Sequence, residues 1–338
     1  MENHGFFGLL TGFAICVRHG ISGGRKGFMK GKIIKGIAGF YYVQTKDSGI
    51  YTCKAKGIFR RLQIKPLVGD NVELSVQDEA AKEGNVDRIL PRENTLLRPA
   101  VANIHQALVV FAIRRPDPNF NLLDRFLVMM EQQGLKSILC FNKSDLSSRE
   151  EEETIRQMYE SGGYRVVFTC AMDGTGIPVL KELLRGSTTT VAGPSGVGKS
   201  SLVNLLQPKA QMETGAISEK IARGKNTTRH SELICIEEDT YIMDTPGFSS
   251  LGLFQLEKEQ LRHYYPEFTP FEGTCRFQGC VHVHEPDCKV REALAEGKIN
   301  KIRYDNYCLL YEEVKGQRRY SYETRNRRTA QCGKEHSV

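Results

Sequence analysis

The stretch GPSGVGKS at residues 193–200 decides the fold of this chain. It matches the pattern G-x-x-x-x-G-K-[ST] and lies between a β-branched run at 188–192 and an apolar, helix-like run at 199–207. In that context the glycines turn backbone N–H groups toward a phosphate, and the start of the helix adds positive potential. We therefore predict a phosphate-binding loop. Its candidate ligands are Gly193, Pro194, Ser195, Gly196, Val197, Gly198, Lys199, Ser200 and Ser201.

Two other loops carry the pattern of a guanine-binding site. NKSD at 142–145 follows the apolar run KSILCFN, and Thr169-Cys170-Ala171 ends the next such run, RVVFTC. A carboxylate in the position of Asp145 accepts from the guanine N1–H and exocyclic amine, a donor pair that adenine lacks. The loops therefore favour GTP over ATP and disfavour an ATP-dependent kinase, the third function considered. The base-binding candidates are Asn142, Lys143, Ser144, Asp145, Cys170 and Ala171.

The motif DTPG at 244–247 follows the predicted strand TYIMD. Asp244 is placed to hold Mg²⁺ through water, and the Gly247 N–H to sense the γ-phosphate. Either Thr227 or Thr228, in the segment before this strand, is a candidate to cap the metal and the phosphate, and the choice stays open. The magnesium candidates are Ser200, Thr227, Thr228 and Asp244.

The residue after DTPG is Phe248, where many GTPases have a glutamine that orients the attacking water. Because phenylalanine cannot orient water, we expect slow intrinsic hydrolysis. The water would then be ordered by His230, by a backbone group or by a partner, although His230 also fits an ordinary surface position. The catalytic candidates are Lys199, Thr228 and His230.

Strands alternate with helices from about residue 105 onward, which predicts a mostly parallel, doubly wound α/β sheet. The motif order is unusual, because the base-reading loops precede the phosphate loop, which precedes DTPG. A compact α/β domain with neighbouring termini tolerates circular permutation, and all the loops still gather at the carboxyl edge of the sheet. DTPG then leads directly into the C-terminal part of the chain.

Residues 31–76 alternate short β-rich runs with glycine turns at roughly ten-residue spacing, which predicts a small oligonucleotide-binding (OB) barrel. Tyr41, Tyr42, Tyr51 and Phe59 are either stacking platforms for bases or core aromatics. The following segment PRENTLLRPAVANIHQ, residues 91–106, is expected to be a linker.

A Cys/His cluster occupies CRFQGCVHVHEPDC at 275–288. Three thiolates and one imidazole suit a closed tetrahedral zinc site, and spacing alone does not decide whether His282 or His284 is the ligand. Runs around the cluster look helical, including LEKEQLRHYY at 256–265. We expect a small helical lobe held by zinc rather than by a large core.

Composition is that of a globular protein: 338 residues, 40% hydrophobic, 26% charged, with 32 Gly and 12 Pro. The length suggests two or three domains, and no apolar run reaches the ~18 residues of a spanning helix. Ten scattered cysteines with one cluster indicate a reducing compartment. The net charge of +7 is uneven, with 12 basic and 2 acidic residues in 1–65 and a second basic run at 315–328. Basic ends around a near-neutral middle indicate a polyanionic partner.

The combination of barrel, permuted NKSD–GPSGVGKS–DTPG order and C-x4-C-x-H-x5-C resembles the ribosome small subunit-dependent GTPase A family over residues 29–330. The resemblance implies zinc ligands at Cys275, Cys280, His282 and Cys288, with His284 outside. It also implies a cytoplasmic GTPase that acts late in small-subunit maturation, binds rRNA, is stimulated by the subunit, and needs Mg²⁺ and Zn²⁺. We expect a monomer with no membrane partner.

The predicted plan has four parts: an extension at 1–28, an OB-fold RNA-binding domain at 29–98, a permuted GTPase domain at 99–258 and a helical zinc domain with a basic tail at 259–338. Met29 is the expected natural start, because the apolar run at 6–17 lacks the basic flank of a signal peptide. A weak membrane anchor is the alternative for that run. The alternative function is an RNA-binding module whose nucleotide is mainly structural.

Overall fold

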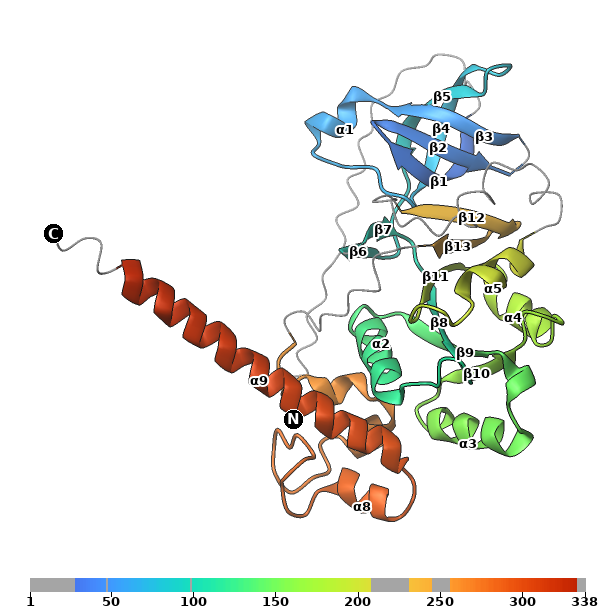
Figure 1. Ribbon diagram of the computed structural model, residues 1–338. Helices are drawn as coiled ribbons and strands as arrows, with labels where there is room; N and C mark the ends of the chain where they lie inside the picture. The colour runs from blue at the N-terminus through green and yellow to red at the C-terminus, as the bar shows by residue number, and fades with distance from the viewer. Residues whose placement is uncertain (1–27, 47, 98, 208–230, 245–255, 333–338) are drawn as a thin grey trace, which may run out of the picture.

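The computed structural model describes residues 28–46, 48–97, 99–207, 231–244 and 256–332; the expected extension before Met29 lies almost entirely outside them. Figure 1 shows a barrel at one end, a central sheet flanked by helices, and a lobe from which the long helix α9 extends. The architecture predicted from the sequence is confirmed: a β-barrel, an α/β domain and a C-terminal helical lobe.

The N-terminal part is a closed five-stranded barrel. Strand β1 pairs with both β2 and β4, β3 pairs with β5 in parallel, and β5 pairs with β4, which closes the ring. Tyr51 and Phe59 are buried in the barrel core, whereas Tyr41 and Tyr42 are partly exposed. Its elements are β1 (Met29–Ile37), β2 (Phe40–Thr45), β3 (Gly49–Ala55), α1 (Gly57–Arg61), β4 (Asn71–Asp78) and β5 (Glu83–Ile89).

The segment expected to be a linker instead forms a hairpin of β6 (Thr95–Leu97) and β7 (Ala100–Ala102). Its end is tied to the barrel, since Asn103 Nδ2 donates to the Gly69 carbonyl at 2.9 Å. Gly69 has φ +93°, and a Cβ there would lie 1.9 Å from the Ala102 carbonyl oxygen. This approach requires glycine, so the connection is a packed element rather than a loose tether.

The central sheet has the strand order β10-β9-β8-β11-β13-β12, parallel except for β12, which confirms the doubly wound prediction. Apolar clusters cover both faces of the sheet. Its strands are β8 (Gln106–Ala112), β9 (Lys136–Asn142), β10 (Arg165–Thr169), β11 (Thr188–Ala192), β12 (Glu232–Glu237) and β13 (Thr240–Asp244). Its helices are α2 (Phe120–Gln132), η1 (Ser144–Leu146, 3₁₀), α3 (Arg149–Glu160), α4 (Ile177–Leu184) and α5 (Lys199–Leu206).

The barrel and the central sheet are continuous through one strand pairing. β1 pairs antiparallel with β12 at Lys35 and Glu232, whose side chains also form an ion pair at 2.9 Å. Lys32 lies 5.4 Å from the centre of the Tyr241 ring on β13. The barrel is therefore joined directly to β12, which pairs with β13, the neighbour of the strand that precedes the phosphate loop.

The C-terminal lobe comprises the 3₁₀ helices η3 (Leu261–Tyr264) and η4 (Pro266–Phe271), then α8 (Lys289–Ala295) and α9 (Lys301–Cys332). The helix expected over 256–265 is only the short η3, because Pro266 disfavours helical geometry in the residue before it. The lobe also has a larger core than expected, built on the packed aromatic rings of Tyr265, Phe268, Tyr304 and Tyr307, of which Tyr265 and Phe268 are stacked and the other pairs meet edge-on or tilted. A metal ion at the Cys/His cluster would therefore add to a core that the aromatic residues already supply.

The lobe docks on α2 through a buried ion network. Arg303 of α9 donates from Nε to Glu267 Oε1 at 2.8 Å and from Nη1 to Asp124 Oδ1, and all three side chains are at most 2% exposed. Asn306 also donates to Asp124 at 2.7 Å. A guanidinium between two carboxylates satisfies charges that burial would otherwise make costly.

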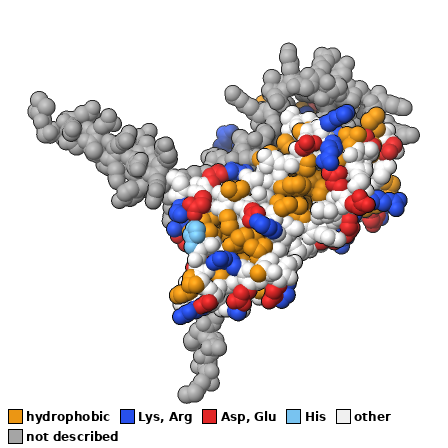
Figure 2. Space-filling view, turned by 60° about the horizontal axis from the view of Figure 1, so that its bottom comes forward, with side chains coloured by type: hydrophobic (Ala, Val, Ile, Leu, Met, Phe, Trp, Pro, Cys, Tyr) orange, Lys and Arg blue, Asp and Glu red, His pale blue; other side chains and the backbone are white. Residues whose placement is uncertain are grey.

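The surface mixes charge and hydrophobic side chains. On the face shown in Figure 2, acidic and basic side chains are interspersed around two hydrophobic areas. Within the described ranges, no helix combines the length and the hydropathy needed to cross a bilayer.

Candidate nucleotide site and metal centre

The phosphate loop lies between β11 and α5, at the carboxyl edge of the parallel strands. Gly193, Gly196 and Gly198 have φ of +139°, +80° and +93°, so the loop uses glycine where other residues would be strained. A Cβ on Gly193 would lie 2.1 Å from the Val110 carbonyl oxygen of the neighbouring β8. Lys199 Nζ donates to the Gly193 carbonyl at 2.9 Å, which holds the ammonium against the loop. The loop therefore has the backbone geometry of an anion cradle.

The NKSD loop is bonded directly to the phosphate loop. Asn142, at the end of β9, is buried and donates from Nδ2 to the Val197 carbonyl at 2.9 Å. Lys143 donates from Nζ to the Gly196 carbonyl at 3.1 Å and also to the Arg115 carbonyl. Two loops more than fifty residues apart in the chain thus form one unit.

The TCA segment lies against the same unit. Thr169 donates from Oγ1 to Asn142 Oδ1 at 3.3 Å. Burial raises the pKa of the Cys170 thiol, and a hydrogen bond with Asp145 raises it further. This hydrogen bond links the two base-reading loops. The Cys170 N–H already donates to the Thr175 carbonyl at 3.0 Å, so Ala171 is the remaining backbone candidate for the guanine oxygen.

The other nucleotide candidates are only partly described. Ser200 and Ser201 are exposed in the first turn of α5, and Ser144 and Asp145 open η1. Asp244 ends β13 beside β11, and its side chain lies outside the described part of the structure. The remaining predicted residues lie outside the described ranges altogether: Thr227, Thr228, His230, Gly247 and Phe248.

The Cys/His cluster converges in the C-terminal lobe. The ligand atoms of Cys275, Cys280, His282 and Cys288 all lie within 4.8 Å of one another. His282 Nδ1 is 3.6 Å from Cys275 Sγ and 3.4 Å from Cys288 Sγ, and these two sulfurs are 4.0 Å apart. Ligands at zinc bond lengths and tetrahedral angles lie about 3.5–3.8 Å apart, so the donor set fits the ion.

His284 does not belong to this cluster. Its side chain is 74% exposed and lies 3.7 Å from Glu312. Of the two histidines that spacing left open, the structure places His282 with the three thiols, and its role as the metal ligand stays a prediction.

Glu285, which did not stand out in the sequence, is a carboxylate that shapes the loop of the Cys/His cluster. Glu285 accepts from the backbone N–H groups of Val281 at 2.8 Å, Val283 at 3.1 Å and His284 at 3.1 Å. Burial acts to raise the pKa of Glu285, but these N–H donors outweigh it and lower the pKa. Tyr304 additionally donates to the His282 carbonyl at 2.7 Å. A glutamate inside the cluster's own loop was the available sequence signal.

The fold and site define a class: a GTPase with circularly permuted motifs, preceded by an OB barrel and followed by a Cys/His lobe. Family models agree, with the RsgA N-terminal domain matching residues 30–85 and the RsgA GTPase domain matching residues 89–254. The chain belongs to the RsgA family of GTPases, and it is a GTP hydrolase.

Individual relatives cover most of the chain. The small ribosomal subunit biogenesis GTPase RsgA of Agathobacter rectalis is 60% identical, over 86% of this chain and 100% of the relative. The protein of the same name in Alkaliphilus metalliredigens is 48% identical, over 86% and 99%. Two solved structures have a TM-score of 0.71: YjeQ from Thermotoga maritima, at 35% identity over 86% of this chain and 99% of that one, and YloQ, a circularly permuted GTPase, at 37% over 89% and 99%.

Proposed function

We propose that this GTPase acts late in the maturation of the small ribosomal subunit, binding the subunit with GTP and leaving after hydrolysis to GDP and phosphate. The single observation that carries the nucleotide assignment is the bond from Asn142 to the Val197 carbonyl at 2.9 Å, which couples the guanine loop to the phosphate loop. The names of the relatives support the subunit as partner. Such a partner implies a cytoplasmic site of action.

For nucleotide recognition, we assign the base to Asp145 and the Lys143 stem, with Ala171 at the guanine oxygen. Asp145 is exposed in η1 beside the Cys170 thiol, where it is accessible to a base. The backbone N–H groups of residues 193–201 and the Lys199 ammonium then neutralise the phosphates. The contacts of Asn142 and Lys143 with the phosphate loop support this division, because they hold the guanine loop beside the phosphates.

For hydrolysis, water attacks the γ-phosphate in line, and the bond to the β-phosphate oxygen breaks to give GDP and inorganic phosphate. Magnesium, when bound, neutralises the charge that develops on the phosphate oxygens. Ser200 presents its hydroxyl at the start of α5, and we assign Asp244 and either Thr227 or Thr228 to complete the magnesium site. Lys199 neutralises the charge that develops on the outer phosphates as GDP leaves, while Thr228 and His230 are the candidates to orient the water.

For the metal centre, we propose one structural zinc held by Cys275, Cys280, His282 and Cys288. Three of the four ligands are buried, which fits a closed structural site rather than a catalytic site with an open position. Zinc would fix the loop whose His282 carbonyl accepts a hydrogen bond from Tyr304 of α9, and so stabilise the junction between the loop and the long helix.

For RNA binding, we assign two basic parts of the chain: the barrel domain, residues 29–98, and the tail of the C-terminal domain, which spans residues 259–338. The GTPase domain between them spans residues 99–258. Residues 29–65 contain nine Lys or Arg and one Asp. Phe40 is 40% exposed, and Lys54 lies 5.3 Å from its ring centre, so a stacking surface lies beside a cation.

The decisive experiment measures phosphate release from GTP with and without purified small subunits. We expect slow release alone and much faster release with subunits, whereas Lys199→Ala abolishes both. Purified large subunits are the matched control for the small subunits and should not stimulate phosphate release. ATP is the matched control for GTP, and small subunits should not stimulate its hydrolysis. Equal rates with and without small subunits would remove the subunit from the proposal.

Two further measurements test the assignments. Asp145→Asn should weaken the preference for GTP over ATP, and equal competition by ATP in the wild type would refute the base-reading loop. Subunit binding should fall ~10³-fold between low and moderate salt if a handful of phosphate contacts is made. Binding that is insensitive to salt would contradict the electrostatic role of the barrel.

A further inference from the structure

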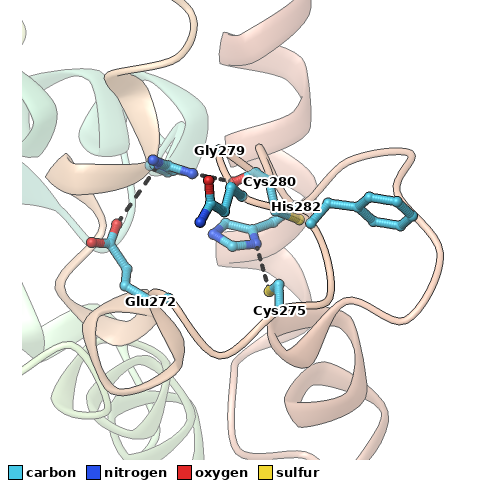
Figure 3. A pocket seen from close by; sticks show the side chains of 9 residues that line it. Glu272, Cys275, Gly279, Cys280 and His282 are labelled. Carbon is cyan, nitrogen blue, oxygen red and sulfur yellow. Dashed lines mark hydrogen bonds and ion pairs between the residues drawn. The ribbon is translucent and has the colours of Figure 1, made fainter.

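A cavity of about 160 Å³ adjoins the metal centre, between the cluster and the turn that follows η4. Its lining includes His282, Glu272, Arg262, Gln278 and Gly279. Figure 3 shows the His282 ring with one edge toward Cys275 and its other edge toward the side that Glu272 lines. The cavity has ample room for water, which needs only about 10–15 Å³.

One wall carries a buried polar atom without a hydrogen bond, and the other wall carries a carboxylate. His282 Nε2 is that atom, and the residue is 1% exposed. Glu272 Oε1 also makes no hydrogen bond of regular geometry, although His263 contacts it as an ion pair. When His282 binds the metal through Nδ1, the neutral ring carries its proton on Nε2 and needs an acceptor there. Glu272 Oε1 is an acceptor on the opposite wall, and water in the cavity can join the two.

Glu272 is held in position from two directions. His263 Nδ1 lies 2.8 Å from Glu272 Oε1 as an ion-pair contact, and Arg262 Nε lies 4.0 Å away. Arg262 in turn donates to the Cys280 carbonyl, next to the metal ligands. These contacts hold the carboxylate beside the metal loop, with the side chain 32% exposed.

We propose that Glu272 is a positioning residue that accepts, through water, the Nε2–H of His282 and so holds the ring with Nδ1 toward the metal. The proposal rests on the zinc site of the proposed function. Hydrogen-bond partners of metal-bound histidines contribute about 10- to 100-fold to metal affinity. The sequence pattern gave no indication of this role, because Glu272 precedes the first cysteine of the cluster.

The test measures zinc affinity of the full-length chain by competition with a chromophoric chelator. Glu272→Ala should weaken zinc binding by about 10- to 100-fold. Glu272→Gln keeps the size and an acceptor oxygen but loses the charge, and it should recover most of the wild-type affinity. Glu296→Ala is the matched control, an exposed glutamate paired with Lys298, and it should leave affinity unchanged.

Each other outcome overturns a stated part of the argument. Unchanged affinity in Glu272→Ala would refute the proposal while leaving the zinc site intact. Equal losses in Glu272→Ala and Glu272→Gln would show that the ion pairs with Arg262 and His263 matter instead of the acceptor oxygen, which also refutes it. A wild-type chain that binds no zinc would overturn the zinc site and this proposal together.

Discussion

The buried guanidinium of Arg303 joins the C-terminal lobe to α2, and Arg303→Met tests how much it contributes to stability. Arg303 is 1% exposed, and its partners Asp124 and Glu267 are 0% and 2% exposed. Removing one partner of a buried ion pair typically costs about 3–5 kcal/mol, because the remaining charges stay desolvated. Here two carboxylates would be left, so we expect a loss of free energy of unfolding at the upper end of that range.

The matched control is Arg125→Met, which breaks the neighbouring contact between α2 and Glu313 of α9. Those side chains are 21% and 35% exposed, so water screens the charges left behind and the loss should be smaller than for Arg303→Met. Urea unfolding of the zinc-saturated protein can be followed by circular dichroism, since the chain contains no tryptophan. Equal losses in the two variants, or a loss below about 1 kcal/mol for Arg303→Met, would refute the reasoning.

The pH dependence gives the same prediction a second readout. Burial raises the pKa of Asp124, and Arg303 acts to lower it. Without the arginine the pKa rises further, so protonation relieves the variant at low pH. The destabilisation should therefore be smaller at pH 5 than at pH 8. If Arg303→Met does not fold, the variant with Asp124→Asn and Glu267→Gln added should, because it leaves no buried charge.

Three smaller predictions concern single residues. Gly198→Ala would put a Cβ 2.3 Å from the amide of the base loop at φ +93°, so GTP affinity measured with a fluorescent analogue should fall at least about tenfold; Gly186→Ala, with nothing within 4 Å, should not change it. Glu285→Gln should lower the melting temperature above pH ~4.3, with the difference vanishing as pH falls through the lowered folded pKa. Gly69→Ala should lower the melting temperature more than Gly39→Ala, because both glycines have positive φ but only the Cβ at Gly69 would meet a hairpin carbonyl, at 1.9 Å; equal losses in the two variants would contradict this reason.

Much of the site could be predicted because nucleotide chemistry restricts residue type at close spacing. The phosphate loop needs glycine at positive φ, and guanine recognition needs a carboxylate, so residue types alone identified residues 193–200 and Asp145. The roles of Tyr51 and Phe59 were not, because an aromatic residue has the same sequence pattern in a core as on a binding face. Their burial decides for the core.

Contacts between distant segments escaped prediction for a different reason. Arg303 and Asp124 are 179 residues apart, and each alone resembles an ordinary surface charge. The segment at 91–106 has the composition of a linker, and only its bonds to the barrel make it a packed hairpin. Short-range propensity contains no information about such partners.

Short-range residue patterns were enough to predict the chemistry: a guanine nucleotide site, its permuted motif order, and a thiolate-rich cluster suited to a metal, because each depends on residue types within a few positions. The three-dimensional structure was needed to show which loops touch, that His282 and not His284 lies in the cluster, and that a buried arginine ties the lobe to α2. The physical reason is that burial and hydrogen bonding across the fold depend on where chain segments meet, which local residue pattern does not specify.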